Sequence, residues 1–410
     1  MNRNTLHVMM YSHDGFGLGH VQRNLGIARR LLELSPGSNV LVLAGTMPPD
    51  TDLPAGIDLI KLPSILKNGT GNWLPRTLSI HKDELKSVRS GIIRHVATAF
   101  RPDVFLVDFV PTGVWGELKP TLKYLCSDHK SSKIILGLRE FLDAPEITRR
   151  QWAKEGAFAA INSYYSRIFV YGNREIFDTA KQYGLEHFTN HTPVEYCGYV
   201  CLPPMPEKMG NIYREIGLDT NRQLVLVTGG GGRDAFPMMK NCLEAFRFLY
   251  NQSAIQGVFV AGPLMSQKEV QTLRNAATGL PVRILDYVRD LKPLMDCAGL
   301  IVSMAGYNTL VEAVGSGKRV LAIPRSGPSM EQKLRADAFS RLGLLEMLTP
   351  DLASPGCLAK RINHMLKNTK MPPSSLVQDG LDRVAERLLQ LGRNDYRVDN
   401  KMSPLNACLG

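Results

Sequence analysis

The chain has 410 residues, 44% of them hydrophobic and 21% charged, with a formal net charge of +11 at neutral pH. This length predicts two domains, and the composition excludes a disordered protein. Because no apolar run reaches about 18 residues and no signal-peptide hydrophobic region follows Met1, we expect a cytoplasmic protein. The positive charge suits anionic ligands or an anionic membrane surface. No basic motif with interleaved aromatic residues is present, so nucleic acid is not an expected partner.

The first half of the chain alternates short apolar runs with longer segments whose apolar residues recur every three or four positions. The apolar runs predict buried strands at residues 6–11, 39–44, 103–108, 133–138 and 167–171. The longer segments predict amphipathic helices at residues 21–34, 83–100, 114–126 and 147–165. This alternation is typical of a parallel, doubly wound sheet.

A proline cluster after residue 201 interrupts the alternation, which then starts again. The later apolar runs predict strands at residues 223–228, 257–262, 282–285, 300–303 and 320–323, and a last amphipathic helix at 376–391. We therefore expect an α/β protein of two doubly wound, Rossmann-like domains that face each other across a cleft. The expected divisions are a first domain at 1–200, a linker at 201–208, a second domain at 209–375, a terminal helix at 376–393 that could pack back on the first domain, and a tail at 394–410.

A glycine-rich turn joins the first predicted strand to the first predicted helix. It reads His13-Asp-Gly-Phe-Gly-Leu-Gly-His20, and its three glycines, Gly15, Gly17 and Gly19, would let the backbone approach a ligand closely. The spacing differs from the dinucleotide-binding fingerprint, and no acidic residue ends the second strand. NAD and FAD are therefore not expected.

His20 is the candidate general base in this turn. It lies in the first turn of a helix, where the helix dipole disfavours protonation and favours the neutral imidazole that a base requires. The alternative is a histidine that only caps the turn. Asp14 is the second candidate for the base, although Asp14 and His13 could both be bystanders.

A second glycine-rich turn opens the second domain. Gly229, Gly230, Gly231 and a fourth glycine follow the predicted strand, and Arg233 comes next. Their free N–H groups could hold phosphate, with Arg233 as a charged partner. The alternative is a flexible surface turn. Because the turn lacks the Lys and Ser/Thr of a P-loop, ATP hydrolysis is not expected.

A third turn, Ser303-Met-Ala-Gly-Tyr-Asn-Thr-Leu-Val-Glu312, carries the strongest signal. It predicts a strand, a tight turn at Gly306 and a helix that begins near Tyr307, with Asn308 or Thr309 as the cap. The open helix N-terminus suits a phosphate. Glu312 leans back toward the same end and could accept hydrogen bonds from hydroxyls, unless it is an ordinary solvated helix residue.

Two further segments could complete a ligand site. Glu331 and Gln332, after a proline-rich loop, could offer acceptor and donor groups to sugar hydroxyls, or could simply begin a helix. The segment Asp286-Tyr-Val-Arg-Asp290, between a strand and a helix, could expose backbone groups to the edge of a nucleobase.

Together these motifs resemble those of GT-B glycosyltransferases of the MurG type, glycosyltransferase family 28, and most of all their uncharacterised relatives called predicted glycosyltransferases. The resemblance rests on the first Gly-rich loop with its histidine, the Gly-rich turn of the second domain, D-Y-V-x-D-L, and S-x-A-G-x-N-T-x-x-E-A followed by E-Q. It is specific over residues 286–339, moderate over 11–34 and weak between 40 and 200.

The resemblance implies roles for individual residues. The position of Glu312 binds the ribose hydroxyls, that of Val288 contacts the nucleobase, and the N–H groups at Gly306, Tyr307 and Asn308 hold the diphosphate. The positions of Glu331 and Gln332 contact the donor sugar. The first loop, with Gly15, Gly17 and Gly19, faces the acceptor, and His20 is the usual candidate base.

Two departures from the family pattern limit the inference. The lipid II enzyme has two glutamines where this chain has Glu331 and Gln332, so specificity for GlcNAc is not implied. Tyr307 is bulkier than the small residue usual at its position.

We therefore predict an inverting, metal-independent glycosyltransferase that moves a sugar from a nucleotide-diphosphate donor to an acceptor hydroxyl, with UDP as the expected nucleotide. The acceptor is a glycan, a lipid-linked molecule or a small molecule, and no cofactor is expected. The only close cysteine pair, Cys197 and Cys201, lacks a second pair to complete a zinc site. One alternative is a UDP-GlcNAc 2-epimerase-like isomerase, which needs carboxylates such as Asp108, Glu117, Glu140 and Asp143 around the sugar. Another is a non-catalytic sugar-nucleotide-binding protein of polysaccharide assembly.

Peripheral contact with the inner face of the membrane is a further expectation. Residues 62–67 and 72–76 could form an apolar patch with a rim of Lys and Arg. They could equally form an acceptor loop or ordinary packing.

Overall fold

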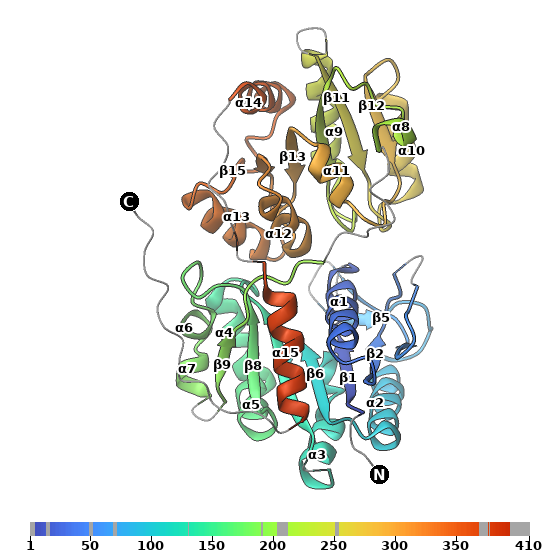
Figure 1. Cartoon of the computed structure of the whole chain (residues 1–410), viewed down its shortest axis with the longest axis vertical. Coiled ribbons are helices and arrows are strands. Elements are labelled where there is room, and N and C mark those ends of the chain that lie inside the picture. The colour runs from blue at the N-terminus through green and yellow to red at the C-terminus, as the bar shows by residue number, and fades with distance from the viewer. Residues whose placement is uncertain are drawn as a thin grey trace.

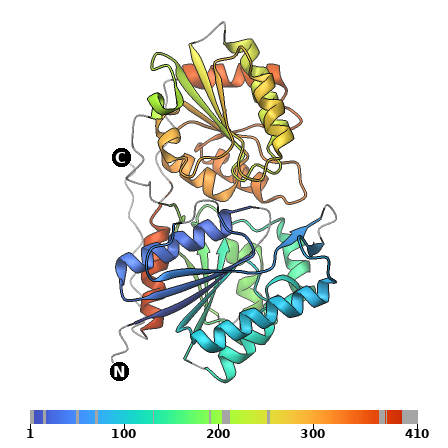
Figure 2. The same cartoon turned by 90° about the vertical axis from the view of Figure 1, so that its right-hand side faces the viewer.

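The computed structural model describes residues 5–13, 17–48, 52–68, 72–129, 131–189, 192–202, 212–250, 254–368, 376 and 378–393. Two α/β lobes are stacked along the long axis of the molecule (Figures 1 and 2). We call the lobe around the sheet of strands β1 to β9 the first lobe, and the lobe around the sheet of strands β10 to β15 the second lobe.

A seven-stranded parallel sheet forms the centre of the first lobe, in the order β3-β2-β1-β6-β7-β8-β9. Its strands are β1 (His7–Ser12), β2 (Asn39–Ala44), β3 (Ile57–Lys61), β6 (Val104–Asp108), β7 (Lys133–Arg139), β8 (Arg167–Tyr171) and β9 (Val194–Tyr196). The strand order reverses between β1 and β6, so their carboxyl ends form the crevice where ligands of such folds bind.

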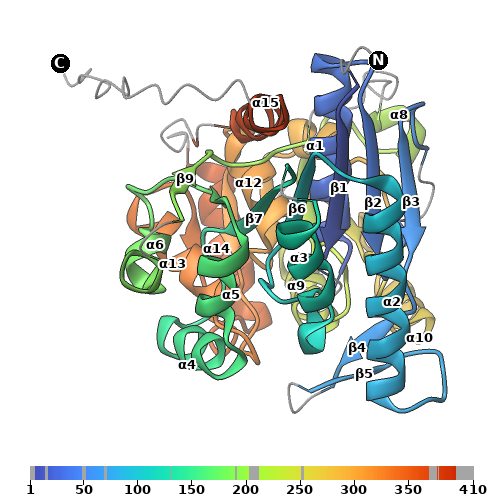
Figure 3. The ribbon, with the colours of Figure 1, turned by 90° about the horizontal axis from the view of Figure 1, so that it is seen from below.

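Helices cover both faces of the first sheet, as Figure 3 shows from below. They are α1 (Gly19–Leu34), α2 (Lys82–Phe100), α3 (Lys119–Ser127), α4 (Pro145–Glu155), α5 (Ala157–Tyr164), α6 (Thr179–Gln182) and α7 (Leu185–Phe188). Side chains alternate between the faces along a strand: Val8 and Met10 pack with α1, whereas Met9 and Tyr11 pack with α2, α3 and α5.

The second lobe repeats the design with a six-stranded parallel sheet in the order β12-β11-β10-β13-β14-β15. Its strands are β10 (Gln223–Thr228), β11 (Ile255–Val260), β12 (Val282–Leu285), β13 (Leu300–Ser303), β14 (Val320–Ala322) and β15 (Glu346–Met347). Its helices are α8 (Ile212–Ile216), α9 (Phe236–Leu249), α10 (Gln267–Ala276), α11 (Lys292–Cys297), α12 (Tyr307–Gly315), α13 (Glu331–Arg341) and α14 (Pro355–Lys367). The predicted fold of two doubly wound sheets is confirmed.

The last helix, α15 (Gly380–Gly392), lies on the first lobe although the second lobe precedes it in the sequence (Figure 1). It packs along α1, where Leu381 approaches Gly26 and Asp382 accepts a hydrogen bond from Arg30. At its other end Gly392 sits against Leu6, where an added Cβ would lie 2.2 Å from that side chain. The chain therefore crosses between the lobes twice.

Three of the predicted helices are wrong in their extent. The segment 114–126 contains a short 3-10 helix, Val114–Gly116, and α3 begins only at Lys119, with Pro120 in its first turn. The segment 147–165 is divided into α4 and α5 at Gly156, whose φ of 71° is a left-handed conformation that ends a helix. The terminal helix begins at Gly380, four residues after the predicted start.

The sequence reading also missed several short strands: β3, β9, β15 and a hairpin of β4 (Ile65–Lys67) and β5 (Trp73–Pro75). No helix among the described residues is long and apolar enough to cross a membrane. The apolar patch expected at 62–67 is not formed, because Leu62 and Ile65 are buried. Lys67, Trp73 and Leu74 instead line the space between the lobes.

Candidate active site

A cleft of about 1460 Å³ lies between the lobes, where the carboxyl ends of the two sheets face each other. Loops that follow β1, β6 and β7 line it from the first lobe, and loops that follow β10, β12 and β13 line it from the second. Every predicted site residue that the structure describes lines this cleft. Asp14 and Gly15, predicted as a base and as part of the acceptor loop, lie outside the described residues.

His20 forms a buried hydrogen-bonded pair with Asp108 on the floor of the cleft. Its Nδ1 donates to Oδ2 of Asp108, and Nη2 of Arg23, one turn further along α1, donates to Oδ1 of the same carboxylate at 2.5 Å. Asp108 is the last residue of β6 and is fully buried, whereas His20 stays 12% exposed toward the cleft. The Nδ1 hydrogen bond leaves Nε2 as the unprotonated nitrogen of a neutral ring.

Burial lowers the pKa of His20, and this effect outweighs the opposing influence of Asp108. Burial alone would raise the pKa of Asp108, but Arg23 and His20 hold it well below its usual range. The pair is therefore a neutral imidazole beside a carboxylate. A neutral His20 was expected, but the main cause is burial and not only the helix terminus.

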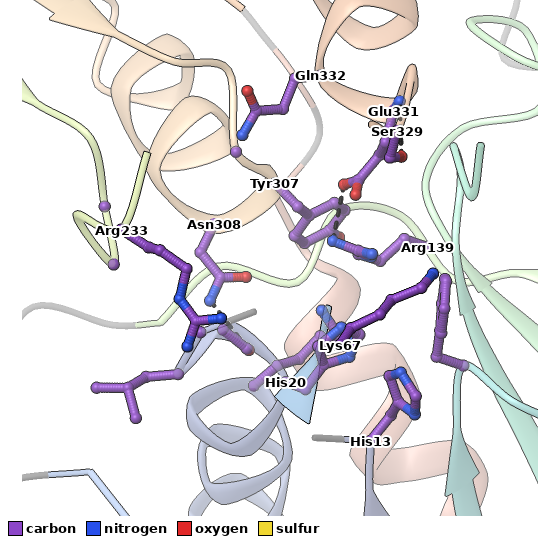
Figure 4. Close-up of a pocket in the computed structure, with 18 of the residues that line it drawn as sticks. His13, His20, Lys67, Arg139, Arg233, Tyr307, Asn308, Ser329, Glu331 and Gln332 are labelled. Atoms are coloured by element: carbon purple, nitrogen blue, oxygen red, sulfur yellow. Dashed lines mark hydrogen bonds and ion pairs between the residues drawn. The ribbon is translucent and has the colours of Figure 1, made fainter. Parts of the chain in front are cut away.

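His13 lies beside His20 and is almost completely buried. The ring centroid of His13 is 5.5 Å from that of His20, 5.3 Å from that of Trp73 and 5.2 Å from that of Phe109. Its Nδ1 has no hydrogen-bond partner among the described residues, and burial holds the pKa of His13 well below its ordinary value. Figure 4 shows both histidines below the second-lobe residues Tyr307 and Asn308.

The acceptor loop contacts the second lobe directly. Nδ2 of Asn308 donates to the carbonyl of Gly19 at 3.1 Å, so Asn308 does not cap α12 as predicted. A Cβ on Gly19 would lie 3.4 Å from this amide, whereas one on Gly17 would meet nothing. This hydrogen bond places the first turn of α1 opposite the first turn of α12.

Helix α12 presents its N-terminus to the cleft. It begins at Tyr307, as predicted, and no side chain caps it, so its first N–H groups are open to a ligand. The left-handed residue of the turn is Ala305, with φ of 62°, and not Gly306, whose φ is −62°. A Cβ on Gly306 would meet nothing within 4 Å, so this glycine leaves space in front of the helix end.

The side chain of Tyr307 does not cap the N-terminus of α12. It is buried between the lobes, where its hydroxyl accepts a hydrogen bond from the N–H of Val200 at 3.0 Å. The guanidinium of Arg23 lies 5.5 Å from its ring and that of Arg335 lies 5.3 Å away. Tyr307 can thus offer only its backbone N–H to a ligand. Its large side chain contacts residues of both lobes.

The second glycine-rich turn is packed and not loose. Gly230 and Gly232 have φ of 65° and 90°, and a Cβ on Gly232 would lie 2.1 Å from the carbonyl of Ala261. A Cβ on Gly229 would lie 2.1 Å from Ala235. Together with Gly231 these glycines bring their backbone to the cleft wall, beside Arg233.

Glu312 lies on the same wall, one and a half turns into α12. It is half-buried, and burial, assisted by the charge of Asp290, raises its pKa to about 8. Val288, on the loop after β12, also lines the cleft and is partly buried. Glu312 could accept hydrogen bonds from the hydroxyls of a ligand, and Val288 could contact a flat ring.

Glu331 differs from its predicted role as a free acceptor. It is 7% exposed, and its Oε1 forms an ion pair with Nη1 of Arg139 at 2.7 Å and accepts a hydrogen bond from Nη2 of Arg335 at 2.8 Å. Oε1 of Gln332 accepts from the N–H of Arg325 at 3.0 Å, which leaves the amide nitrogen for a ligand. Figure 4 shows Glu331 above Arg139, with Gln332 across the upper wall.

The carboxylates that an epimerase would need are occupied by other contacts. Glu117 is fully buried against Arg89, Glu140 pairs with Arg335, and Asp143 accepts from the N–H of Met330. Asp108, which the sequence suggested only as a carboxylate for the epimerase alternative, is the partner of His20. The position of Asp108 at the end of a strand beside β1 was the signal that could have identified it. Within the described residues no group of three or more His, Cys, Asp and Glu side chains could hold a metal ion.

Comparisons with known proteins place this site in a class. Residues 224–385 match the glycosyltransferase family 28 C-terminal domain. The processive diacylglycerol beta-glucosyltransferase of Bacillus subtilis is 26% identical over 59% of this chain and 65% of its own length. The UDP-N-acetylglucosamine–N-acetylmuramyl-(pentapeptide) pyrophosphoryl-undecaprenol N-acetylglucosamine transferase of Desulfitobacterium hafniense is 25% identical over 75% of this chain and 76% of its own length.

Solved structures share the fold. MurG of Acinetobacter baumannii superposes with a TM-score of 0.55 over 95% of this chain and 99% of its own, at 15% identity. The glycotransferase of kitacinnamycin gives 0.58 over 95% and 96%, at 16% identity. Fold and site thus define a glycosyltransferase with the GT-B fold. Within it, the second lobe carries the similarity to glycosyltransferase family 28, since the model of that family's C-terminal domain matches residues 224–385.

Proposed function

We propose that the chain transfers a sugar from a UDP-linked donor to an acceptor hydroxyl, with inversion at the anomeric carbon and without a bound metal ion. One observation carries the proposal. The neutral His20, held by Asp108, lies across the cleft from the open N-terminus of α12, and the hydrogen bond between Asn308 and Gly19 holds these two helix ends together. The proposed base and the proposed phosphate site therefore face the same part of the cleft.

The donor would occupy the second lobe. The N–H groups of the first turn of α12, the glycine turn at Gly229–Gly231 and Arg233 would hold the diphosphate. Glu312 would accept hydrogen bonds from the ribose hydroxyls, and the loop at Val288 would contact the base. Gln332 would reach the donor sugar, whereas Glu331 would act mainly by orienting Arg139. The names of the related enzymes support UDP as the nucleotide.

The acceptor would react from the first lobe. Nε2 of His20 takes the proton of the acceptor hydroxyl as the acceptor oxygen bonds to the anomeric carbon and the bond to the diphosphate breaks. The carboxylate of Asp108 stabilises the imidazolium that forms. Attack from the face opposite the leaving group inverts the anomeric centre in one displacement. Asp14 remains the alternative base.

Metal independence follows from the way the leaving diphosphate would be neutralised. The partial positive charge of the α12 N-terminus and the guanidinium of Arg233 both line its position. We expect transfer rates to be unchanged after dialysis against EDTA, as measured by release of UDP. A loss of about tenfold or more that added Mg²⁺ restores would contradict this part of the proposal.

Replacement of Glu312 by glutamine tests the donor site. Because a hydrogen bond to a carboxylate contributes about 1.5–3 kcal/mol, Glu312→Gln is expected to weaken binding of UDP-glucose by about tenfold or more. The pKa of about 8 means that Glu312 is mostly protonated at pH 7 in the free protein. Hydroxyl donors favour its ionised form, so affinity should rise with pH up to about pH 8 and then level off.

Isothermal titration with UDP-glucose at several pH values would measure both effects. The matched control is Glu244→Gln, on α9 outside the cleft, which should change neither the affinity nor its pH dependence. Glu312→Gln should also remove the rise in affinity toward pH 8. Unchanged binding and an unchanged pH profile in this variant would show that Glu312 does not touch the donor.

The related enzymes suggest where the reaction takes place. One is named for diacylglycerol and another for a pyrophosphoryl-undecaprenol acceptor. We therefore extend the proposal to a lipid-linked acceptor, met by a cytoplasmic protein at the inner face of the membrane. Failure of the protein to float with anionic vesicles at low salt would contradict the membrane contact.

A further inference from the structure

The first-lobe wall of the cleft carries a compact group of side chains that the proposed reaction does not yet use. We call His13, Lys67, Trp73, Phe109 and Arg139 the acceptor wall. All five line the cleft, and they come from three places: the end of β1, the β4–β5 hairpin, and the ends of β6 and β7. Figure 4 shows Lys67 and Arg139 between His13 and Glu331.

His13 is the centre of the acceptor wall. Its ring lies edge-on to that of Trp73 and tilted against that of Phe109, with centroid distances of 5.3 and 5.2 Å. Nζ of Lys67 lies 5.7 Å from the centroid of the Trp73 ring, and the guanidinium carbon of Arg139 lies 5.1 Å from that of Phe109. Lys67 and Trp73 are direct partners in the register of the hairpin, so the hairpin delivers both together. Two cations thus lie near the imidazole of His13: Lys67 beside the Trp73 ring and Arg139 beside the Phe109 ring.

The charges around the acceptor wall do not cancel. Asp108 is matched by Arg23, and Glu140 by Arg335. Glu331 is the counter-charge of Arg139, which it engages through Nη1. Lys67 has no ion-pair partner among the described residues. Within the part of the chain that the structure describes, the cleft wall therefore keeps an uncompensated positive charge near His13.

Hydrogen-bonding capacity is also left over at this place. Nδ1 of His13 and Nε of Arg139 are buried, and neither has a partner among the residues that the structure describes. Buried polar groups are normally satisfied, so such atoms in a cleft indicate a missing ligand group or water. Further out, four more basic residues line the same side of the cleft, opposed there by Glu155 and by the backbone-bonded Asp143: Lys82, Lys119, Arg150 and Lys154.

We propose that the acceptor wall binds an oxyanion of the acceptor, a phosphate or a carboxylate close to the hydroxyl that reacts. This inference rests on the proposed function and deepens it by giving the class of acceptor. Lys67 supplies the charge, Arg139 and His13 supply hydrogen bonds, and Trp73 offers a flat apolar surface to a sugar ring. A neutral acceptor would leave the positive charge and the buried nitrogens without a partner, so the wall selects against it.

A binding experiment with small charged sugars tests this directly. The protein is first saturated with UDP, so that the donor phosphate site is filled. Glucose, glucose 6-phosphate and glucuronate are then titrated, and binding is followed by tryptophan fluorescence and by calorimetry. We expect one or both charged sugars to bind at least about tenfold more tightly than glucose, with a preference that weakens as salt is added. The two charged probes distinguish a phosphate from a carboxylate.

Substitutions at Lys67 assign the effect to the wall. Lys67→Met should reduce the advantage of the charged sugar by about tenfold, and Lys67→Arg should largely retain it. Lys123→Met removes the same charge from the exposed face of α3 and should change nothing. Thermal unfolding and UDP affinity, measured on each variant, confirm that the fold and the donor site persist.

The outcome separates this inference from the proposed function. The acceptor wall does not bind an oxyanion if charged sugars bind no better than glucose. The same conclusion follows if Lys67→Met still binds charged sugars more tightly than glucose. The transferase proposal would still stand in that case, provided that Glu312→Gln weakens the binding of UDP-glucose. If instead Glu312→Gln binds UDP-glucose as the unmodified protein does, while the charged sugars still bind more tightly than glucose, only the assignment of the donor site is contradicted.

Discussion

His20→Ala is expected to lower the rate of sugar transfer by about 10²- to 10⁴-fold, the range that a positioned general base contributes. The structure explains why neither hydrogen-bond partner in the His20–Asp108–Arg23 group would replace it. Nε2 of His20 is the unprotonated nitrogen, because Nδ1 donates to Asp108, and Asp108 itself is fully buried and faces away from any acceptor. Arg23, the other partner of Asp108, is a cation and cannot take a proton.

Binding of the donor should survive this change, because the proposed contacts to UDP come from the second lobe. The measurement is therefore a pair: UDP affinity by calorimetry and turnover by UDP release, on the same preparation. His95→Ala, an exposed histidine on α2, is the matched control and should retain full turnover. If His20→Ala transfers sugar at the normal rate, His20 is not the base, and Asp14 becomes the candidate.

Arg335→Met is expected to be the most destabilising of the changes considered, by about 3–5 kcal/mol in the free energy of unfolding, because it breaks a buried ion pair by removing one partner. Arg335 is fully buried. Its Nε donates to Glu140 at 2.8 Å, its Nη2 to Glu331 at 2.8 Å and its Nη1 to the carbonyl of Ala305 at 3.0 Å. Burial already raises the pKa of Glu140, and the loss of Arg335 would leave that carboxyl without its cation.

The change also tests how the lobes are held together, since Glu140 belongs to the first lobe and Arg335 to the second. Urea unfolding followed by circular dichroism gives the free energy, and small-angle scattering reports separation of the lobes. Arg341→Met, at the exposed end of the same helix, should cost little. A change below about 1 kcal/mol for Arg335→Met would place this ion pair among those that contribute little to stability.

Local signals in the sequence were sufficient for most of the fold and for half of the site. The long apolar runs predicted the central strands of both sheets. Five of them agree with the structure residue for residue: 39–44, 167–171, 223–228, 282–285 and 300–303. His20 and the α12 N-terminus were also found, because each is defined by a turn and the helix that follows it. Single glycines inside helical patterns, such as Gly156, were passed over.

What could not be predicted depends on which distant segments meet. Asp108 lies 88 residues from His20, and the two meet only because β6 pairs with β1. The ion pair of Glu331 with Arg139 could not be predicted either, because it forms only when the two lobes are in contact. The burial of the Tyr307 side chain, with its hydrogen bond to Val200, was missed for the same reason. The β4–β5 hairpin was missed because three-residue strands carry too little periodicity to recognise.

The return of α15 to the first lobe has a consequence for how such enzymes can be recombined. The second lobe, which the proposal makes the donor lobe, is an insertion in the chain of the first and not a tail appended to it. Consider a hybrid with one junction, after residue 202, in which all later residues come from a relative with another donor specificity. Its α15 would also come from that relative. Its Leu381 and Gly392 contacts with Gly26, Leu6 and Val104 would then have to be matched by chance. Two junctions, the second before α15, would preserve them.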